Sequence, residues 1–354
     1  MGGSESKNAF KVIKTVSLGR AAADKKPTAI SSISISNDEL FMVSSRHNLI
    51  DLWDAKFADL VTTLEGHQDA ITCVRQTPDR RLIVSCSADG TMRVWVKPGG
   101  RWACAEVISV VHGGWAWHAE WLADIGFLSV GTDGHLVVWN IDPRGKLIEA
   151  IIDCSVHAKS ITCATVLSDR YRVTIVTGSN DKTIVVSELT CSESEGYVLK
   201  FVNRLPGHEA EVNCLDSFVF PRLYGSVIVS GGRDSTIRIW TLSDIIELAG
   251  SKTAVVPHVM HPCGGEVCCV KFTQEGRYFL ASTDKEITVF RTPIPGLKVE
   301  SQKLACFLPR LSGSSIRSIS WGFDNTVIFA GTEDGALLQI HVPKMYHRHK
   351  RLSS

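Results

Sequence analysis

The sequence predicts an all-β fold: a seven-bladed β-propeller in which each blade is a small four-stranded antiparallel sheet. Two observations predict it. One phrase recurs along the chain at spacings of roughly 42 to 53 residues, as expected for blades of about 40 to 45 residues plus loop insertions, and each copy divides into short strands of alternating apolar and polar residues separated by turns. With 354 residues, of which 44% are hydrophobic and 21% charged, the chain can bury the core of one large domain.

The clearest copy of the phrase begins at Gly66-His67 and ends at Trp95. Its apolar runs are ITCV and IVS, followed by the turn SADG and the last strand MRVW. A second clear copy runs from Gly207-His208 to Trp240. A GH start and a near-WD end are the signature of a WD repeat, whose unit is one propeller blade.

Seven copies are found when the turn residues are placed in register. The turn position is held by His47, Asp89, Asp133, Asp181, Asp234, Asp284 and Asp334. Six residues later stand Trp53, Trp95, Trp139, Ser187, Trp240, Phe290 and Ile340. A fixed offset repeated in this way predicts seven blades.

Three copies, the second, third and fifth, contain a complete set of four polar residues at matching places. These are His67, Ser85, Asp89 and Trp95; His112, Ser129, Asp133 and Trp139; and His208, Ser230, Asp234 and Trp240. We expect each set to form a buried hydrogen-bonded tetrad, since buried polar groups are tolerated when they are paired. The Ser-His-Asp combination is also that of a hydrolase triad, but its repetition favours a structural role over catalysis.

The other four copies lack parts of this set. At the equivalent positions the first copy has Val43 and His47, the fourth has Ser187, the sixth has Leu280 and the seventh has Ala330. We expect these blades to depend more on apolar packing. No metal constellation, phosphate-binding glycine loop or unrepeated acid–base pair stands out, so we expect neither an enzyme nor a cofactor or small-molecule substrate.

Eleven cysteines raise the question of zinc or disulfides. Cys73, Cys163, Cys214 and Cys269 all fall at the same place in the first strand of their blades, where they would be spread around a ring. We interpret them as small buried hydrophobic residues, which agrees with a reducing cytoplasm, and we expect no metal site.

The ends of the chain complete the predicted organisation. Residues 1–9 are polar and expected to be disordered, 10–343 form the propeller, and 344–354 form a basic tail. The alternating segment 10–16 is predicted to complete the last blade and to close the ring, which removes free sheet edges. Segment 243–252 opens with Ser and Asp and is expected to form a short helix.

The expected cellular location follows from the net charge, the hydropathy and the N-terminal sequence. The formal net charge is +1, no stretch approaches 18 consecutive apolar residues, and there is no hydrophobic signal core. We therefore expect a soluble cytoplasmic protein. The start MGGSES fits the N-myristoylation pattern at Gly2, and membrane contact is expected only if that residue is acylated.

The last two copies give a more specific resemblance. Segment 264–290, which contains RYFL at 277–280, and segment 315–342, with Ser318, Trp321 and FAG before Asp334, resemble the receptor for activated C kinase family. This family comprises the Gβ-like proteins of the small ribosomal subunit. The resemblance implies a scaffold that binds ribosomal RNA and proteins of the small subunit and docks signalling proteins such as kinases.

The resemblance also implies site residues. The family's first-blade turn contacts ribosomal RNA, and of its basic residues only Arg46 is matched here. Other basic residues could supply the missing phosphate contacts: Lys25, Lys26, Arg348, Lys350 and Arg351. The kinase-docking segments of the family correspond to residues that include Gly265, Glu266, Lys271 and Glu286, although strand formation explains the same residues equally well.

A second function remains open beside this one. The chain could be a ribosome-independent scaffold of the Gβ-like or ligase-adaptor type that recognises a peptide of a partner over the central channel. Trp115 and Trp117 depart from the repeat pattern and are either an exposed anchor for a partner or part of the packing between blades.

Overall fold

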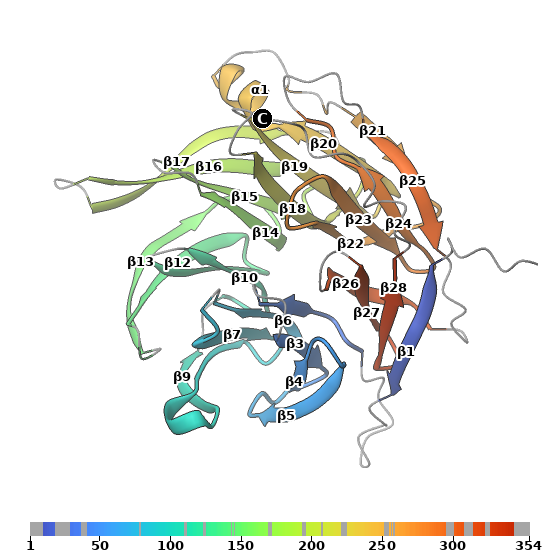
Figure 1. The fold of residues 1–354 in the computed structure, drawn as a ribbon. Helices are drawn as coiled ribbons and strands as arrows, with labels where there is room; N and C mark the ends of the chain where they lie inside the picture. Colours follow the sequence, from blue (N-terminus) through green and yellow to red (C-terminus); the bar gives the residue numbers. More distant parts are fainter. Residues whose placement is uncertain are drawn as a thin grey trace, which may run out of the picture.

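Seven four-stranded antiparallel sheets surround a common centre, as Figure 1 shows for this computed structural model. The predicted seven-bladed propeller is confirmed. The structure describes residues 10–17, 29–36, 41–77, 79–109, 112–122, 125–142, 144, 146–168, 172–192, 196–206, 208–220, 225–250, 255, 257, 259–294, 301–307, 314–322 and 326–342.

The first four blades follow one another along the chain. Blade one contains β2 (Ile33–Ile35), β3 (Phe41–Arg46), β4 (Leu49–Asp54) and β5 (Asp59–Glu65). Blade two contains β6 (Ile71–Gln76), β7 (Leu82–Ser87), β8 (Thr91–Val96) and β9 (Ala103–Ser109). Blade three contains β10 (Ala116–Leu122), β11 (Gly126–Gly131), β12 (His135–Ile141) and β13 (Leu147–Ser155). Blade four contains β14 (Ile161–Ser168), β15 (Val173–Ser179), β16 (Ile184–Ser192) and β17 (Gly196–Leu205).

The remaining blades are built in the same way, except the last. Blade five contains β18 (Val212–Phe220), β19 (Gly225–Gly232), β20 (Thr236–Thr241) and β21 (Val259–Pro262). Blade six contains β22 (Val267–Phe272), β23 (Tyr278–Thr283), β24 (Ile287–Arg291) and β25 (Gln302–Phe307). Blade seven contains β26 (Ile316–Trp321), β27 (Val327–Thr332), β28 (Ala336–His341) and β1 (Lys11–Ser17).

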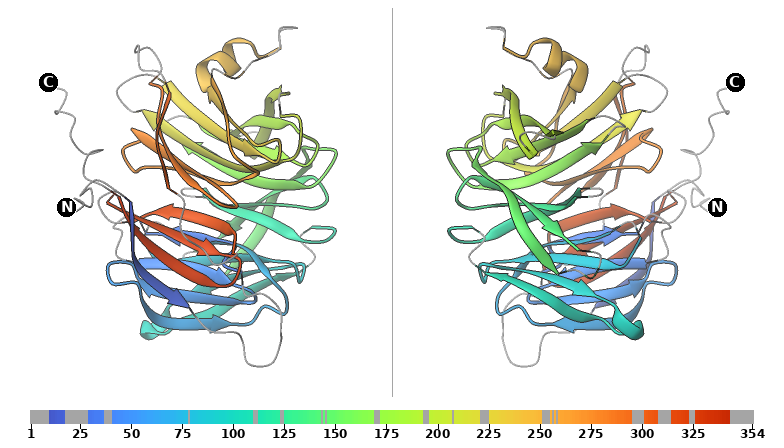
Figure 2. Two further views of the ribbon diagram at one scale, coloured as in Figure 1. Left: turned by 90° about the vertical axis from the view of Figure 1, so that its right-hand side faces the viewer. Right: turned by 90° about the vertical axis from the view of Figure 1, so that its left-hand side faces the viewer.

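The ring is closed by β1, which pairs with β28 from Lys11 opposite His341 to Ser17 opposite Ala336. Both views in Figure 2 show this N-terminal strand beside the last strands of the chain. The predicted closure by the N-terminal strand is therefore confirmed. It matters because an unpaired β28 would leave a free row of backbone donors and acceptors.

The first strand of each blade is the innermost one. It packs against the first strands of both neighbouring blades, from β2·β6 around to β22·β26 and back to β2·β26. The apolar core lies between adjacent blades: one cluster joins Cys73, Val84 and Cys86 of blade two to Phe127 and Trp139 of blade three. Full burial of a side chain such as Phe127 stabilises the fold by about 1.5–3 kcal/mol.

Two kinds of register irregularity recur in the blades. One lies near the start of the first strand, for example between Ile71 and Cys73 in blade two. The other lies immediately before the tryptophan position of the third strand, for example between Val94 and Trp95. A β-bulge of this kind re-aims the neighbouring side chains, and the bulges of the first strands lie in the wall of the central cavity.

The connection between β20 and β21 of blade five contains the helix α1 (Leu242–Glu247), as predicted for segment 243–252. Asp244 lies in its first turn, and its carboxylate accepts a hydrogen bond from the Thr241 hydroxyl at 2.9 Å. Across the described part of the chain, no helix has the length and apolar character needed to span a bilayer.

Candidate functional site

A cavity of about 790 Å³ lies at the centre of the ring and is lined by all seven blades. Its wall is formed mainly by the innermost strands, because these are the strands nearest the axis. Six of the lining residues stand at the register irregularity of an inner strand: Thr72, Trp117, Thr162, Asn213, Cys268 and Arg317. The bulges therefore turn one residue per blade toward the cavity in six of the seven blades.

Ionic side chains connect neighbouring blades deeper in the wall. The Arg75 Nε of blade two donates to Glu120 Oε2 of blade three at 3.1 Å, and its Nη2 is 3.4 Å from His118 Nε2. Burial disfavours ionisation of Glu120, but the charge of Arg75, the hydrogen bond and charge of His118 and the charge of Lys271 together outweigh burial and lower the pKa of this carboxyl. On the opposite side, Lys271 Nζ is 3.2 Å from Asp216 Oδ1. These pairs neutralise the buried charges, as interior ions require.

The rim of the cavity has a different character, because its side chains also face solvent. Trp115 is 46% exposed and its ring lies 5.3 Å from that of Trp117 in an edge-to-face contact. Asp69, also on the rim, accepts a hydrogen bond from the backbone N–H of Ala70, and no cation in the described part of the chain pairs with it.

Two further rim residues are already paired. Arg317 Nη2 is 3.1 Å from Glu333, and Glu266 accepts a hydrogen bond from Asn213 at 2.8 Å. Among the aspartate, glutamate, lysine and arginine residues of the lining that the structure describes, Asp69 is therefore the one without an ion pair. Trp115 therefore fits the expectation of an exposed anchor for a partner. Trp117 is partly buried in the lining of the cavity and packs against Trp115.

The predicted kinase-docking residues lie partly on this rim. Glu266 is a rim residue, and Lys271 lies in the cavity wall, paired with Asp216. Gly265 is in the turn before β22, where an added Cβ would approach an Asp284 carboxylate oxygen to 2.7 Å. The side chain of Glu286 is mostly buried, 3.9 Å from Lys303 Nζ. The structure therefore brings two of the four to the central cavity.

The predicted RNA contact at Arg46 is not supported by the position of this side chain. Arg46 is buried, and its guanidinium group forms two hydrogen bonds with Asp51, at 2.7 and 3.1 Å. It cannot reach a phosphate without breaking this pair. The sequence could not show this, because Asp51 is brought to Arg46 by the hairpin between β3 and β4.

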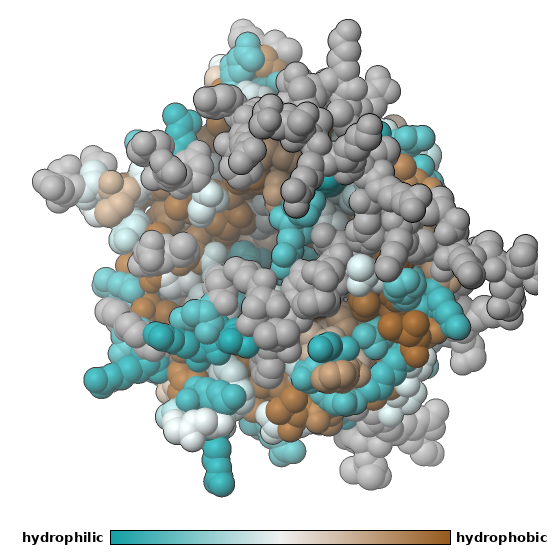
Figure 3. Space-filling model, viewed as in Figure 1, coloured by the Kyte–Doolittle hydropathy of each residue, from teal (hydrophilic) through white to brown (hydrophobic). Residues whose placement is uncertain are grey.

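The other predicted contact and modification residues cannot be placed in this way. Gly2, Lys25, Lys26, Arg348, Lys350 and Arg351 lie outside the described residues, as do segments 1–9 and 344–354 as a whole. On the face drawn in Figure 3, hydrophilic and hydrophobic residues are interspersed among the grey atoms.

The three complete tetrads have the hydrogen bonds expected for them. In blade two, His67 Nδ1 is 2.9 Å from Asp89 and its Nε2 is 2.8 Å from the Ser85 hydroxyl, which also accepts from Trp95 Nε1 at 2.9 Å. The same connections occur in blades three and five, among His112, Asp133, Ser129 and Trp139 and among His208, Asp234, Ser230 and Trp240.

The hydrogen bonds of these tetrads hold the strands and turns of one blade together, which is a structural role and not a catalytic one. Each set is satisfied by a neutral imidazole that donates from Nδ1 to the aspartate and accepts at Nε2 from the serine. Burial is the largest cause that lowers the pKa of His67, His112 and His208. The serine hydroxyls are fully buried and already bonded to histidine and tryptophan, so they have no access to a substrate.

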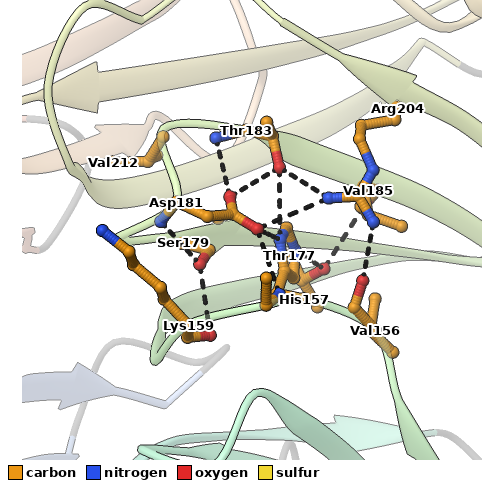
Figure 4. Close-up of polar contacts among 12 residues, drawn as sticks. Val156, His157, Lys159, Thr177, Ser179, Asp181, Thr183, Val185, Arg204 and Val212 are labelled. Atoms are coloured by element: carbon orange, nitrogen blue, oxygen red, sulfur yellow. Dashed lines mark hydrogen bonds and ion pairs between the residues drawn. The ribbon is translucent and has the colours of Figure 1, made fainter.

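Blade four contains most of a tetrad that the sequence pattern did not reveal. Figure 4 shows His157 between Asp181 and Thr177, with Nδ1–Oδ2 and Nε2–Oγ1 distances of 2.9 Å each. Thr177 takes the place of serine, and Arg204 approaches Asp181 at 3.4 Å. The missing signal was a GH start, because His157 follows Val156 rather than Gly.

Blade one also differs from its prediction. Val43 stands at the expected serine position by counting, but the hydroxyl that accepts from Trp53 Nε1, at 2.9 Å, belongs to Ser44. The turn between β3 and β4 is shorter than its equivalents, so Trp53 follows its serine by nine residues and Trp95 follows Ser85 by ten. Counting back from the turn therefore selected the wrong residue.

Comparison with known proteins agrees with this architecture. Residues 58–96 and 199–241 match the family "WD domain, G-beta repeat". Arabidopsis thaliana "WD repeat-containing protein 26 homolog" is 22% identical over 310 residues, covering 75% of this chain and 49% of that protein. "Nuclear distribution protein nudF" of Emericella nidulans is 30% identical over 205 residues, covering 52% and 42%.

"Protein transport protein SEC13-2" of Candida glabrata is 21% identical over 271 residues, covering 71% of this chain and 86% of that protein. The chain spans less than half the length of the first two relatives. Taken with the seven four-stranded sheets, the matches show that the chain is a seven-bladed β-propeller with WD40 repeats.

Proposed function

We propose that this protein is a non-catalytic scaffold that binds an extended segment of a protein partner across the mouth of its central cavity, with Trp115 as the anchor. The exposure of this tryptophan on the rim of a cavity of about 790 Å³ carries the proposal. Tryptophan is enriched among the residues that dominate binding energy at protein interfaces.

The chemistry of the rim favours a basic partner segment. The ring of Trp115 and the carboxylate of Asp69 lie on neighbouring blades, and both line the cavity. A lysine or arginine side chain could contact both groups, and a cation–π contact at an exposed site contributes about 0.5–1 kcal/mol. The relatives' names refer to nuclear distribution and protein transport, so they do not agree on one partner.

The proposal is tested with a displayed library of linear peptides selected on the whole protein. We expect the enriched peptides to share a basic residue and to quench tryptophan fluorescence. Trp115→Ala should weaken their binding by about 30-fold or more, which corresponds to about 2 kcal/mol at a central anchor. Asp69→Asn should weaken it less and remove its salt dependence.

Phe201→Ala is the matched control. Phe201 is also exposed, at 63%, but lies on β17, the outer strand of blade four. Its replacement should leave peptide binding unchanged. The proposal would be overturned if selected peptides bound Trp115→Ala as tightly as the unchanged protein, or if binding depended on Phe201 instead.

A second candidate is the ribosome-bound cytoplasmic scaffold implied by the last two blades. The observation that favours it is the resemblance of segments 264–290 and 315–342 to the receptor for activated C kinase family. Co-sedimentation with small ribosomal subunits at low and high salt tests it. Lys25→Glu with Lys26→Glu, and separately Arg348→Glu with Arg351→Glu, should weaken comigration; protein that stays at the top of a low-salt gradient would exclude this role.

A further inference from the structure

Two cysteines face each other across neighbouring strands of blade two. Cys73 on β6 and Cys86 on β7 are register partners in the antiparallel pairing of these strands. Both side chains belong to the apolar cluster between blades two and three, so they project from the same face of the sheet. Both are free thiols.

This placement suits a disulfide. Directly opposed residues of antiparallel strands have Cα atoms about 4.5 to 5.5 Å apart, and a disulfide requires about 4.4 to 6.8 Å. The register pairing therefore brings the Cα atoms of Cys73 and Cys86 into the range of separations that disulfides span.

Equivalent positions in other blades differ from blade two in the residue that opposes the inner-strand cysteine. Glycine stands opposite the inner-strand residue in blades four and five. A Cβ added at Gly178 would lie 2.8 Å from Cys163 Sγ, and one added at Gly231 would lie 2.7 Å from Cys214 Sγ. A side chain at these glycines would force the sulfur to move, and in blade two, where Cys86 stands in that place, the Cys73 sulfur donates to the Ala119 carbonyl oxygen of blade three at 3.7 Å. Only in blade two, among the blades with a described cysteine on the inner strand, does a second cysteine take that opposite position.

The surroundings of Cys73 favour the reactive form of its sulfur. Burial alone would raise the pKa of this thiol, but the positive charges of Arg75 and His118 outweigh burial and lower it. Burial raises the pKa of Cys86, which therefore stays a thiol. Cys73 lines the central cavity, which gives a small reagent a route to the sulfur. Burial raises the pKa of Cys163 to about 12 and that of Cys214 well above its ordinary value.

We propose that Cys73 and Cys86 are a redox-active pair that hydrogen peroxide, entering through the central cavity, converts to an intramolecular disulfide. The Cys73 thiolate attacks one peroxide oxygen, so that an S–O bond forms, the O–O bond breaks and hydroxide leaves, taking a proton to become water. The Cys86 thiol then attacks the Cys73 sulfenic acid, forming the S–S bond and releasing a second water. The two sulfurs together lose two electrons, and the peroxide gains them.

Peptide mapping of the whole protein tests this pair directly. After brief exposure to hydrogen peroxide, remaining thiols are blocked and the protein is digested with trypsin without reduction. Cleavage after Arg and Lys separates Cys73, in peptide 57–75, from Cys86, in peptide 82–93. We expect these peptides to appear as one disulfide-linked species that disappears on reduction.

The variants identify the attacking and the resolving sulfur. In Cys86→Ser, the Cys73 sulfenic acid should persist and be trapped by dimedone, with labelling at least about tenfold above that of Cys214 in the same sample. Cys86→Gly reproduces the arrangement of blades four and five and should behave in the same way. In Cys73→Ser, dimedone should label Cys86 no more than Cys214.

The proposal would be overturned if peroxide oxidised the exposed Cys104, Cys191 and Cys306 in the unchanged protein without producing the linked peptides. It would also be overturned if Cys73 in Cys86→Ser were labelled no faster than Cys214. The linked-peptide measurement uses the unchanged protein, so it decides the question even if a variant fails to fold.

Discussion

Arg46 is bound to Asp51 inside the first blade, by hydrogen bonds of 2.7 Å from Nε to Oδ2 and 3.1 Å from Nη2 to Oδ1. Asp51 is fully buried and also accepts from the Thr63 hydroxyl at 2.7 Å. The three residues connect β3, β4 and β5 of a blade that lacks the histidine of the complete tetrads. A residue with the sequence context of a surface cation thus has a structural role.

Replacement of Arg46 should therefore lower the stability of the protein, whatever its effect on the binding of a partner. Arg46→Glu would place a second carboxylate against the buried Asp51 and lower the free energy of unfolding by about 3–5 kcal/mol. Urea unfolding at neutral pH measures this. Arg233→Glu is the control, because the Arg233 side chain is 62% exposed, and it should change stability by no more than about 0.5 kcal/mol. Equal effects of the two variants would contradict the buried pair.

Replacement of Asp181, the turn aspartate of blade four, should lower the stability of the protein strongly. Its carboxylate accepts from His157, from the Thr183 hydroxyl at 2.6 Å and from the Thr183 backbone N–H at 2.9 Å. Asp181→Ala removes the carboxylate acceptor of the buried imidazole and leaves its Nδ1 only the Thr183 hydroxyl at 3.2 Å, so it should cost about 3 kcal/mol.

The seventh blade supplies the comparison for this substitution. Asp334 occupies the same turn position in blade seven, whose sequence has no histidine before its first strand, and its carboxylate accepts a hydrogen bond from the Thr332 hydroxyl. Asp334→Ala should cost roughly 1 kcal/mol. A loss of stability in Asp334→Ala as large as in Asp181→Ala would show that the histidine contributes nothing.

Stability should fall as pH falls through the histidine range. Burial is the largest cause that lowers the pKa values of His67, His112, His157 and His208 from 6.5. Between these lowered values and 6.5 the unfolded chain binds more protons than the folded one, so the stabilisation is complete above 6.5 and is lost below it.

Urea midpoints measured from pH 8 to pH 5.5 test this pH dependence. The midpoint should be flat above about pH 7.5 and decline steadily below pH 6.5. His157→Gln removes one of the buried histidines whose pKa is lowered and should reduce the slope. A midpoint that rises on acidification would mean that the histidines are held as imidazolium ions.

The fold could be predicted because its determinants are local and repeated. The alternation within strands and the six-residue offset from the turn to the tryptophan position recur in every blade, including those where Ser187 or Ile340 replaces tryptophan. The closing strand could be inferred for the same reason, since residues 10–16 alternate between apolar and polar residues as the strands of the blades do. A missing residue in one turn was enough to move the serine assignment from Ser44 to Val43.

The site depends on relationships that the repeat does not encode. Trp117 and Thr72 both face the cavity because each lies at a bulge of its inner strand, and a bulge has no fixed sequence signal. Cys73 has the sequence context of the other inner-strand cysteines, which are expected to be inert. Its distinct environment comes from Arg75, from His118 of the next blade, and from Cys86 across the sheet.

Removal of the closing strand should open the propeller. In β1, Val12 and Val16 alternate toward the core and pack, with Phe10, against blades six, seven and one, and Phe10 stacks on Phe307 at a centroid distance of 5.6 Å. Deletion of residues 1–17 removes these contacts and exposes the edge of β28, so it should lower the melting temperature by about 10 °C and promote self-association. Deletion of residues 1–9 alone keeps β1 and should leave both unchanged. A synthetic peptide of residues 10–17 should restore the monomer by adding the strand back. If the longer deletion melted like the shorter one and stayed monomeric, the β1–β28 pairing would not be what closes the ring.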